Sequence, residues 1–87
     1  MKTVYKYHIQ ITDIQAIDMP FGAELLHAGL DPAGLPCVWA QVDNLNSSEP
    51  VKIAVTGTGS PMPEGDVEHV GSFVDGSFVW HVWRVNK

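Results

Sequence analysis

The stretch Ser72-Phe73-Val74-Asp75-Gly76-Ser77-Phe78-Val79-Trp80-His81-Val82-Trp83 decides the fold class. Two runs of β-branched and aromatic residues flank Asp75-Gly76, a dipeptide that favours a two-residue type I′ turn between antiparallel strands. The sequence therefore predicts a β-hairpin at the C-terminal end of the chain, over residues 68–85.

Placing Asp75-Gly76 in the loop fixes the register of this hairpin, because side chains alternate between the two faces of a strand. Phe73 is then expected opposite Phe78. Trp80 is expected opposite Gly71, where its ring would cover bare backbone.

Two further expectations follow from the same register. His69 and His81 fall on opposite faces, so they could not share a ligand. The run 78–83 is apolar on both faces, which is typical of a strand without a solvent-facing side. We therefore expect this strand to be central in a sheet or to lie in an interface between copies of the chain.

Upstream, alternation with a period of two is typical of half-buried strands in several short segments. These segments are residues 3–11, 14–19, 37–42 and 51–56. Segment 23–28 contains good helix formers but is short and has no helix cap, so we predict a strand there. A single helical turn at Leu25-Leu26 is the alternative.

Five or six short strands with no convincing amphipathic helix predict an all-β, mainly antiparallel fold, as a small sandwich or barrel-like sheet. The 87 residues are enough for one domain, 1–87, and no more. A core this small, with aromatic residues on both faces of one strand, also predicts a homo-oligomer, a dimer or larger.

Composition excludes several classes of function. Five basic against ten acidic residues give a net charge of -5, the wrong sign for binding along duplex nucleic acid. No apolar run approaches the roughly 18 residues of a membrane span, so we expect no membrane association. Cys37, the single cysteine, excludes an intrachain disulfide and is compatible with a reducing cytosol.

The sequence offers little for catalysis or metal binding. The four histidines form neither an H-E-x-x-H nor a His-x-His pattern, and Cys37 has no second cysteine as a partner for a metal. A lone cysteine in a strand is usually a small buried hydrophobe. We therefore expect no catalytic residue, no metal site, no cofactor and no enzymatic activity.

A small ligand is the better-supported prediction. The Gly57–Ser60 turn ends a strand with small residues, which allow backbone N–H groups to approach an anion. The tryptophans offer flat surfaces for a base, and nearby polar side chains offer anchors. The predicted ligand-binding residues are Gly57, Thr58, Gly59, Ser60, Trp80, His81, Trp83, Arg84 and Glu24. Strand alternation puts Arg84 with Trp80 and Trp83 with His81, so one subunit cannot present them all from one side.

Four segments together resemble a family of short bacteriophage and prophage accessory proteins. They are the Lys-Tyr-x-Ile-Pro/Gln-Ile-like strand at Lys6–Ile11, the Met19–His27 stretch, the Gly-Thr-Gly-x-Pro turn at Gly57–Pro61 and the closing Phe-Val-Trp-His-Val segment at Phe78–Val82. The resemblance covers nearly the whole chain. Two positions depart from the family pattern, since Gln10 stands where proline is common and Ser60 where histidine is common.

The resemblance implies a viral protein in the cytoplasm of a bacterial host, but it brings no settled activity. By analogy with other small phage proteins, we expect an anti-defence protein that sequesters a nucleotide-derived immune signal, an ADP-ribose conjugate or a cyclic oligonucleotide. One alternative is a protein–protein inhibitor that docks on a host defence factor through its acidic surface. The other is a small virion or scaffold component.

Overall fold

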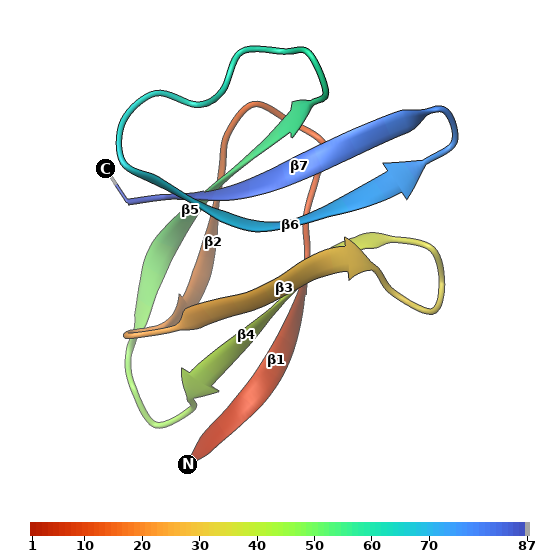
Figure 1. Ribbon diagram of the computed structural model, residues 1–87. Helices are drawn as coiled ribbons and strands as arrows, with labels where there is room; N and C mark the ends of the chain where they lie inside the picture. Colours follow the sequence, from red (N-terminus) through yellow and green to blue (C-terminus); the bar gives the residue numbers. More distant parts are fainter. Residues whose placement is uncertain (87) are drawn as a thin grey trace.

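The computed structural model describes residues 1–86, which form seven β-strands and no helix (Figure 1). The strands are β1 (Lys2–His8), β2 (Gln15–Pro20), β3 (Glu24–Leu30), β4 (Pro36–Asp43), β5 (Ser48–Gly57), β6 (Val67–Asp75) and β7 (Phe78–Val85). The predicted all-β class is confirmed, with one or two strands more than expected. None of the described residues forms a helix that could span a membrane.

The strands pair in two antiparallel sheets, one in the order β1-β4-β3 and the other in the order β2-β5-β7-β6. In Figure 1, β3 of the first sheet runs beside β6 of the second. β7 lies between β5 and β6, so the strand with two apolar faces is central in its sheet, as one of the two sequence-based interpretations proposed. Residues 24–28 of the segment 23–28 belong to β3, which confirms the strand prediction for it.

Apolar residues from both sheets form one core between them, where the largest fully buried side chains include Met19, Ile53 and Val38. The rest of that set is Val42, Val82 and Cys37. Cys37 differs from the others because it does not belong to the core cluster. In β4 it shares a face with Trp39, whereas Val38 points from the opposite face into the core.

The C-terminal hairpin exists, but its predicted register is wrong. Asp75 pairs with Phe78, so the two loop residues are Gly76 and Ser77. Gly76 has a φ of 61° and Ser77 does not have a positive φ. This is the pattern of a type II′ turn, which needs glycine at its first central position, instead of the predicted type I′ turn. Phe73 consequently lies opposite Trp80, not opposite Phe78.

A β-bulge in β6 overturns a second prediction about this hairpin. His69 pairs with Trp83 and Gly71 with Val82, so Val70 is an extra residue without a partner position in β7. One extra residue moves all side chains before it to the other face. His69 therefore lies on the same face as His81, and the expectation that they occupy opposite faces was wrong.

Gly71 of β6 makes a close contact with the other sheet. A Cβ atom at Gly71 would be 2.9 Å from both the backbone nitrogen and the carbonyl oxygen of Ala28 in β3. Trp80, which the sequence placed over Gly71, instead lies against Gly57 of β5, its partner in the sheet. Gly71 thus allows contact between the sheets, and a different glycine accommodates the tryptophan.

Candidate ligand-binding site

The Gly57–Ser60 turn begins at the last residue of β5 and is hydrogen-bonded to β7. The backbone N–H of Thr58 donates to Val79 O at 3.2 Å, and that of Ser60 donates to Gly57 O at 3.0 Å. Gly59 has a φ of +89°, a conformation that L side chains rarely adopt. Because two of the N–H groups are already paired within the protein, the turn offers fewer free donors to an anion than the sequence suggested.

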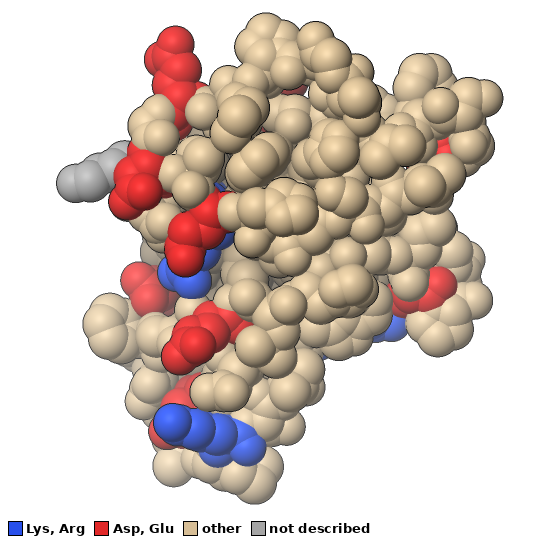
Figure 2. Space-filling view, in the orientation of Figure 1, with Lys and Arg blue, Asp and Glu red and all other residues tan. Residues whose placement is uncertain are grey.

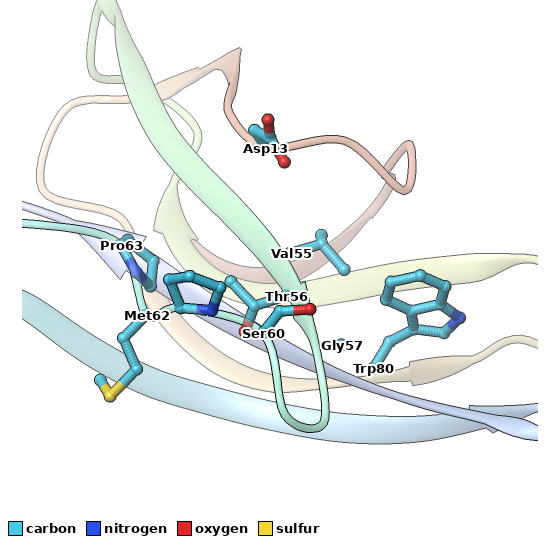
Figure 3. Close-up of a pocket in the computed structure, with 9 residues that line it drawn as sticks. Asp13, Val55, Thr56, Gly57, Ser60, Met62, Pro63 and Trp80 are labelled. Carbon is cyan, nitrogen blue, oxygen red and sulfur yellow. The ribbon is translucent and has the colours of Figure 1, made fainter.

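Trp80 packs its six-membered ring on this turn. Its Cζ3 atom lies 3.3 Å from the position that a Cβ on Gly57 would occupy. Figure 3 shows the indole nitrogen pointing away from Gly57 and Ser60, and this Nε1 atom is buried with no hydrogen-bond partner among the described residues. Trp80 therefore presents flat carbon surface to the turn.

A hollow of about 460 Å³ opens beside Trp80 (Figure 3). Cavities of roughly 300–1,000 Å³ are typical of small-molecule sites. Its lining combines the end of β5 with the proline-rich segment after the turn and a carboxylate from the β1–β2 connection. The lining residues are Asp13, Val55, Thr56, Gly57, Ser60, Pro61, Met62, Pro63 and Trp80.

A second hollow, of about 470 Å³, shares Gly57, Ser60 and Trp80 with the first. Phe78 adds an aromatic ring whose centroid is 5.8 Å from that of Trp80, with 31° between the planes. The other lining residues are Thr58, Ser77 and Val79. We call the two hollows together the Trp80 groove.

A row of hydrogen bonds crosses the outer face of the sheet from the groove. Thr58 Oγ1 and His81 Nε2 are 2.7 Å apart, and Ser72 Oγ lies 2.8 Å from His81 Nδ1. Ser72 Oγ is also 3.2 Å from His69 Nε2. These four residues form the histidine row, and Thr58 belongs both to the row and to the lining of the groove.

Trp83 lies on the same face as the row but has a different environment from Trp80. Its Nε1 donates a hydrogen bond to Thr56 Oγ1 at 2.9 Å. Its ring meets the imidazole of His69 edge to face, with centroids 5.1 Å apart and 64° between the planes. The bulge in β6 makes this contact possible, because it brings His69 to this side of the sheet.

Arg84 and Glu24 lie at a separate cleft between the two sheets, lined also by Glu68 and His69. The Arg84 Nη1 atom donates to Ala23 O at 2.7 Å, which ties β7 to the start of β3. The structure therefore divides the predicted ligand-binding residues into three groups. Gly57, Thr58, Ser60 and Trp80 line the Trp80 groove, with Gly59 in the same turn; His81 and Trp83 lie on the outer face; and Arg84 and Glu24 lie apart.

Asp31 is a buried charge in the turn that follows β3. Its side chain is 3% exposed, and Oδ1 accepts hydrogen bonds at 2.9 Å from the backbone N–H groups of Ala33 and Leu35. Oδ2 accepts from Lys6 Nζ at 3.0 Å and lies 3.2 Å from His8 Nε2. The hydrogen bond from Leu35 first, and then that from Lys6, hold the pKa of the Asp31 carboxyl well below its usual range.

This depressed pKa predicts a loss of stability in acid. Below about pH 4, the ordinary pKa of an aspartate, the unfolded chain takes up a proton that the folded chain does not. The free energy of unfolding therefore decreases as pH falls. We expect the urea midpoint of the wild type to fall between about pH 5 and pH 2, and that of Asp31→Asn to fall less steeply from a lower starting value. Equal slopes in the two proteins would contradict this role for Asp31.

Comparison with known proteins identifies the family and nothing beyond it. The whole chain, residues 1–87, matches the family model described as Domain of unknown function (DUF7352). No curated protein and no solved structure matches the chain. The chain, which forms two antiparallel sheets, therefore belongs to the DUF7352 family.

Proposed function

We propose that this protein binds and sequesters a small nucleotide-derived ligand without transforming it. The observation that carries the proposal is the Trp80 groove, where two hollows of ligand size flank one aromatic surface. Phe78 is 64% exposed, so an arriving base could stack on it. The hydroxyl groups of Thr58, Ser60 and Ser77 border the same space and could bond the ribose.

The charge of the groove suggests how such a ligand would lie. Among the described residues, no lysine or arginine lines either hollow, whereas Asp13 lines the first. A phosphate in the first hollow would face a carboxylate. We therefore place the base and ribose in the second hollow, with the phosphate directed past Thr58 toward His81 and Ser72, whose N–H and O–H groups can donate to an anion.

Binding without chemistry fits the surroundings of the two histidines. In residues 1–86, the hydrogen bonds of His69 and His81 lead to hydroxyl groups, not to a carboxylate that would orient an imidazole as a general base. The hydroxyl group of Ser72 is shared between the two rings, and that of Thr58 also contacts His81. This arrangement favours recognition over hydrolysis.

The biological setting rests on the resemblance to phage accessory proteins. We propose that the protein acts in the cytoplasm of an infected bacterium and counters host defence by holding an ADP-ribose conjugate or a cyclic oligonucleotide. Sequestration requires only tight, stoichiometric binding, which a small binding domain could provide without a cofactor.

Native mass spectrometry tests this proposal directly. The purified protein is incubated with ADP-ribose, cyclic ADP-ribose isomers and a panel of cyclic dinucleotides and trinucleotides. The proposal expects one of them to add its intact mass at a fixed ratio, and the same spectrum reports how many copies of the chain assemble. Release of a fragment of the added compound would indicate an enzyme, and no adduct from any member of the panel would contradict the proposed ligand class.

Two phenylalanine variants locate the site. Phe78→Ala should weaken binding by about 5- to 150-fold, because stacking of a base on an aromatic ring contributes about 1–3 kcal/mol. Phe21→Ala is the matched control, since Phe21 is 63% exposed and lies in the turn between β2 and β3, away from the groove. Equal affinities of the two variants would place the ligand outside the Trp80 groove.

A second function, inhibition of a host protein, is favoured by the charge distribution. Figure 2 shows acidic side chains gathered along one side of the molecule, with few basic ones between them. Such a side would attract a basic protein and raise its rate of association. Charge reversal at Asp66 and Glu68 should then abolish capture of the host protein, whereas Phe78→Ala should leave it unchanged.

A further inference from the structure

Three side chains with metal-binding atoms meet on the outer face of the smaller sheet. His8 ends β1 and pairs with Cys37 of β4, so both side chains lie on the same face. Asp31 follows β3 and reaches over this face. The imidazole nitrogen, the thiol sulfur and the carboxylate oxygen all lie within 4.8 Å of one another.

The Asp31 carboxylate is held in position before any ion arrives. Two backbone N–H groups fix Oδ1 at 2.9 Å, which directs Oδ2 toward His8 at 3.2 Å. Metal sites depend on such second interactions, because they orient the ligand and limit its freedom. The turn from Asp31 to Leu35 therefore acts as a frame for one oxygen ligand.

Cys37 is buried under this same turn and outside the core. Its Sγ atom lies 3.4 Å from Leu35 O. Cys37 does not belong to the cluster of core residues. The side chain of His8, in contrast, is 60% exposed. An ion could thus approach from solvent past His8 and reach the sulfur without opening the core.

We propose that His8, Asp31 and Cys37 bind a single Zn²⁺ ion, with water as the fourth ligand. Zn²⁺ prefers nitrogen, sulfur and carboxylate oxygen ligands in a tetrahedron, at about 2.0–2.3 Å. Ligand atoms in such a tetrahedron are about 3.3–3.8 Å apart, so side chains already within 4.8 Å need only small movements. The Cys37 thiol gives its proton to solvent as the sulfur–zinc bond forms.

Lys6 competes with the ion for Asp31. Its ammonium group lies 3.0 Å from Oδ2, the oxygen that the ion would use, and its side chain is 39% exposed. When the ion binds, the ammonium group can move into solvent while the ion replaces its positive charge. Removing the charge by Lys6→Met is therefore expected to strengthen metal binding.

Titration with Co²⁺, which can occupy zinc sites and is coloured, tests this proposal. The wild type is expected to bind one Co²⁺ per chain, with a thiolate-to-cobalt charge-transfer band in the near ultraviolet, and Zn²⁺ is expected to bleach this band. Cys37→Ser should abolish the band, His8→Ala should lower the affinity about tenfold or more, and Lys6→Met should raise it.

His69→Ala is the matched control, because His69 is also exposed but lies on the other sheet, and it should bind Co²⁺ like the wild type. Circular dichroism checks that each variant is folded. If Cys37→Ser does not fold, His8→Ala still tests the proposal, because it changes an exposed side chain. Absence of the band in the folded wild type, or the same affinity in His8→Ala, would overturn the proposal. Neither readout involves a nucleotide, so the result is independent of the proposed function.

Discussion

Replacing Gly71 by alanine is expected to lower the free energy of unfolding by about 3 kcal/mol. The new Cβ atom would lie 2.9 Å from the nitrogen and the oxygen of the Ala28 backbone. A backbone cannot swing aside as a side chain can, so β3 and β6 would have to separate. Separation would also loosen the core packing between the two sheets.

Urea denaturation followed by tryptophan fluorescence measures this effect, which corresponds to a fall in the thermal midpoint of roughly 10 °C or more. Gly29→Ala is the control. There the nearest atom to the new Cβ is His27 Nε2 at 3.1 Å, the tip of a flexible side chain that can move away. Similar losses in the two variants would contradict the close approach of β3 and β6 at Gly71.

Met19→Ala is expected to lower the free energy of unfolding by about 2–5 kcal/mol, the range for removal of a large buried side chain. Met19 is completely buried, whereas its neighbours Asp18 and Pro20 on the edge strand β2 are not. It therefore anchors β2 to the core. Thermal unfolding measures the loss against Leu45→Ala, which changes a side chain that is 84% exposed and should have almost no effect. A small effect of Met19→Ala would show that β2 is held mainly by its pairing with β5.

Local sequence patterns predicted the fold class, because alternation and turn residues determine which segments can be strands. They could not predict the register of the last hairpin. Asp75-Gly76-Ser77 fits a type I′ turn with Asp75 and Gly76 in the loop and a type II′ turn with Gly76 and Ser77 in the loop, so the turn residues alone leave both open. The bulge at Val70 was also hidden, since it has no local signal comparable to that of a turn.

The sequence predicted the part of the candidate site that is formed by one turn and the neighbouring strand. Gly57, Ser60 and Trp80 were grouped in one site from their residue types, and they meet because β5 and β7 pair. Arg84 and Glu24 do not meet them, because the separate cleft depends on how the two sheets pack. The role of Asp31 was missed for a similar reason: its partners Lys6 and His8 are more than twenty residues away in the chain.

The same reason explains why the sequence carries no local signal for the proposed metal site. Ligand motifs are recognised by short spacing within one segment. His8, Asp31 and Cys37 come from β1, the turn after β3, and β4, and the pairing of β1 with β4 brings two of them together. Alternation along β1, together with knowledge that β1 pairs with β4, would have placed His8 and Cys37 on one face.

Chemical-shift mapping with the nucleotide identified by mass spectrometry, or with ADP-ribose as the probe, tests the central claim most directly. The three indole N–H groups give separate reporters, because Trp80 lies in the groove, Trp83 lies on the outer face and Trp39 lies in the other sheet. If the Trp80 groove binds the ligand, the Trp80 indole and the amides of Thr58 and Ser60 shift together and saturate at one affinity, while Trp39 stays unchanged. Shifts confined to Trp39 and its sheet, with no change at Trp80, would contradict the proposed site.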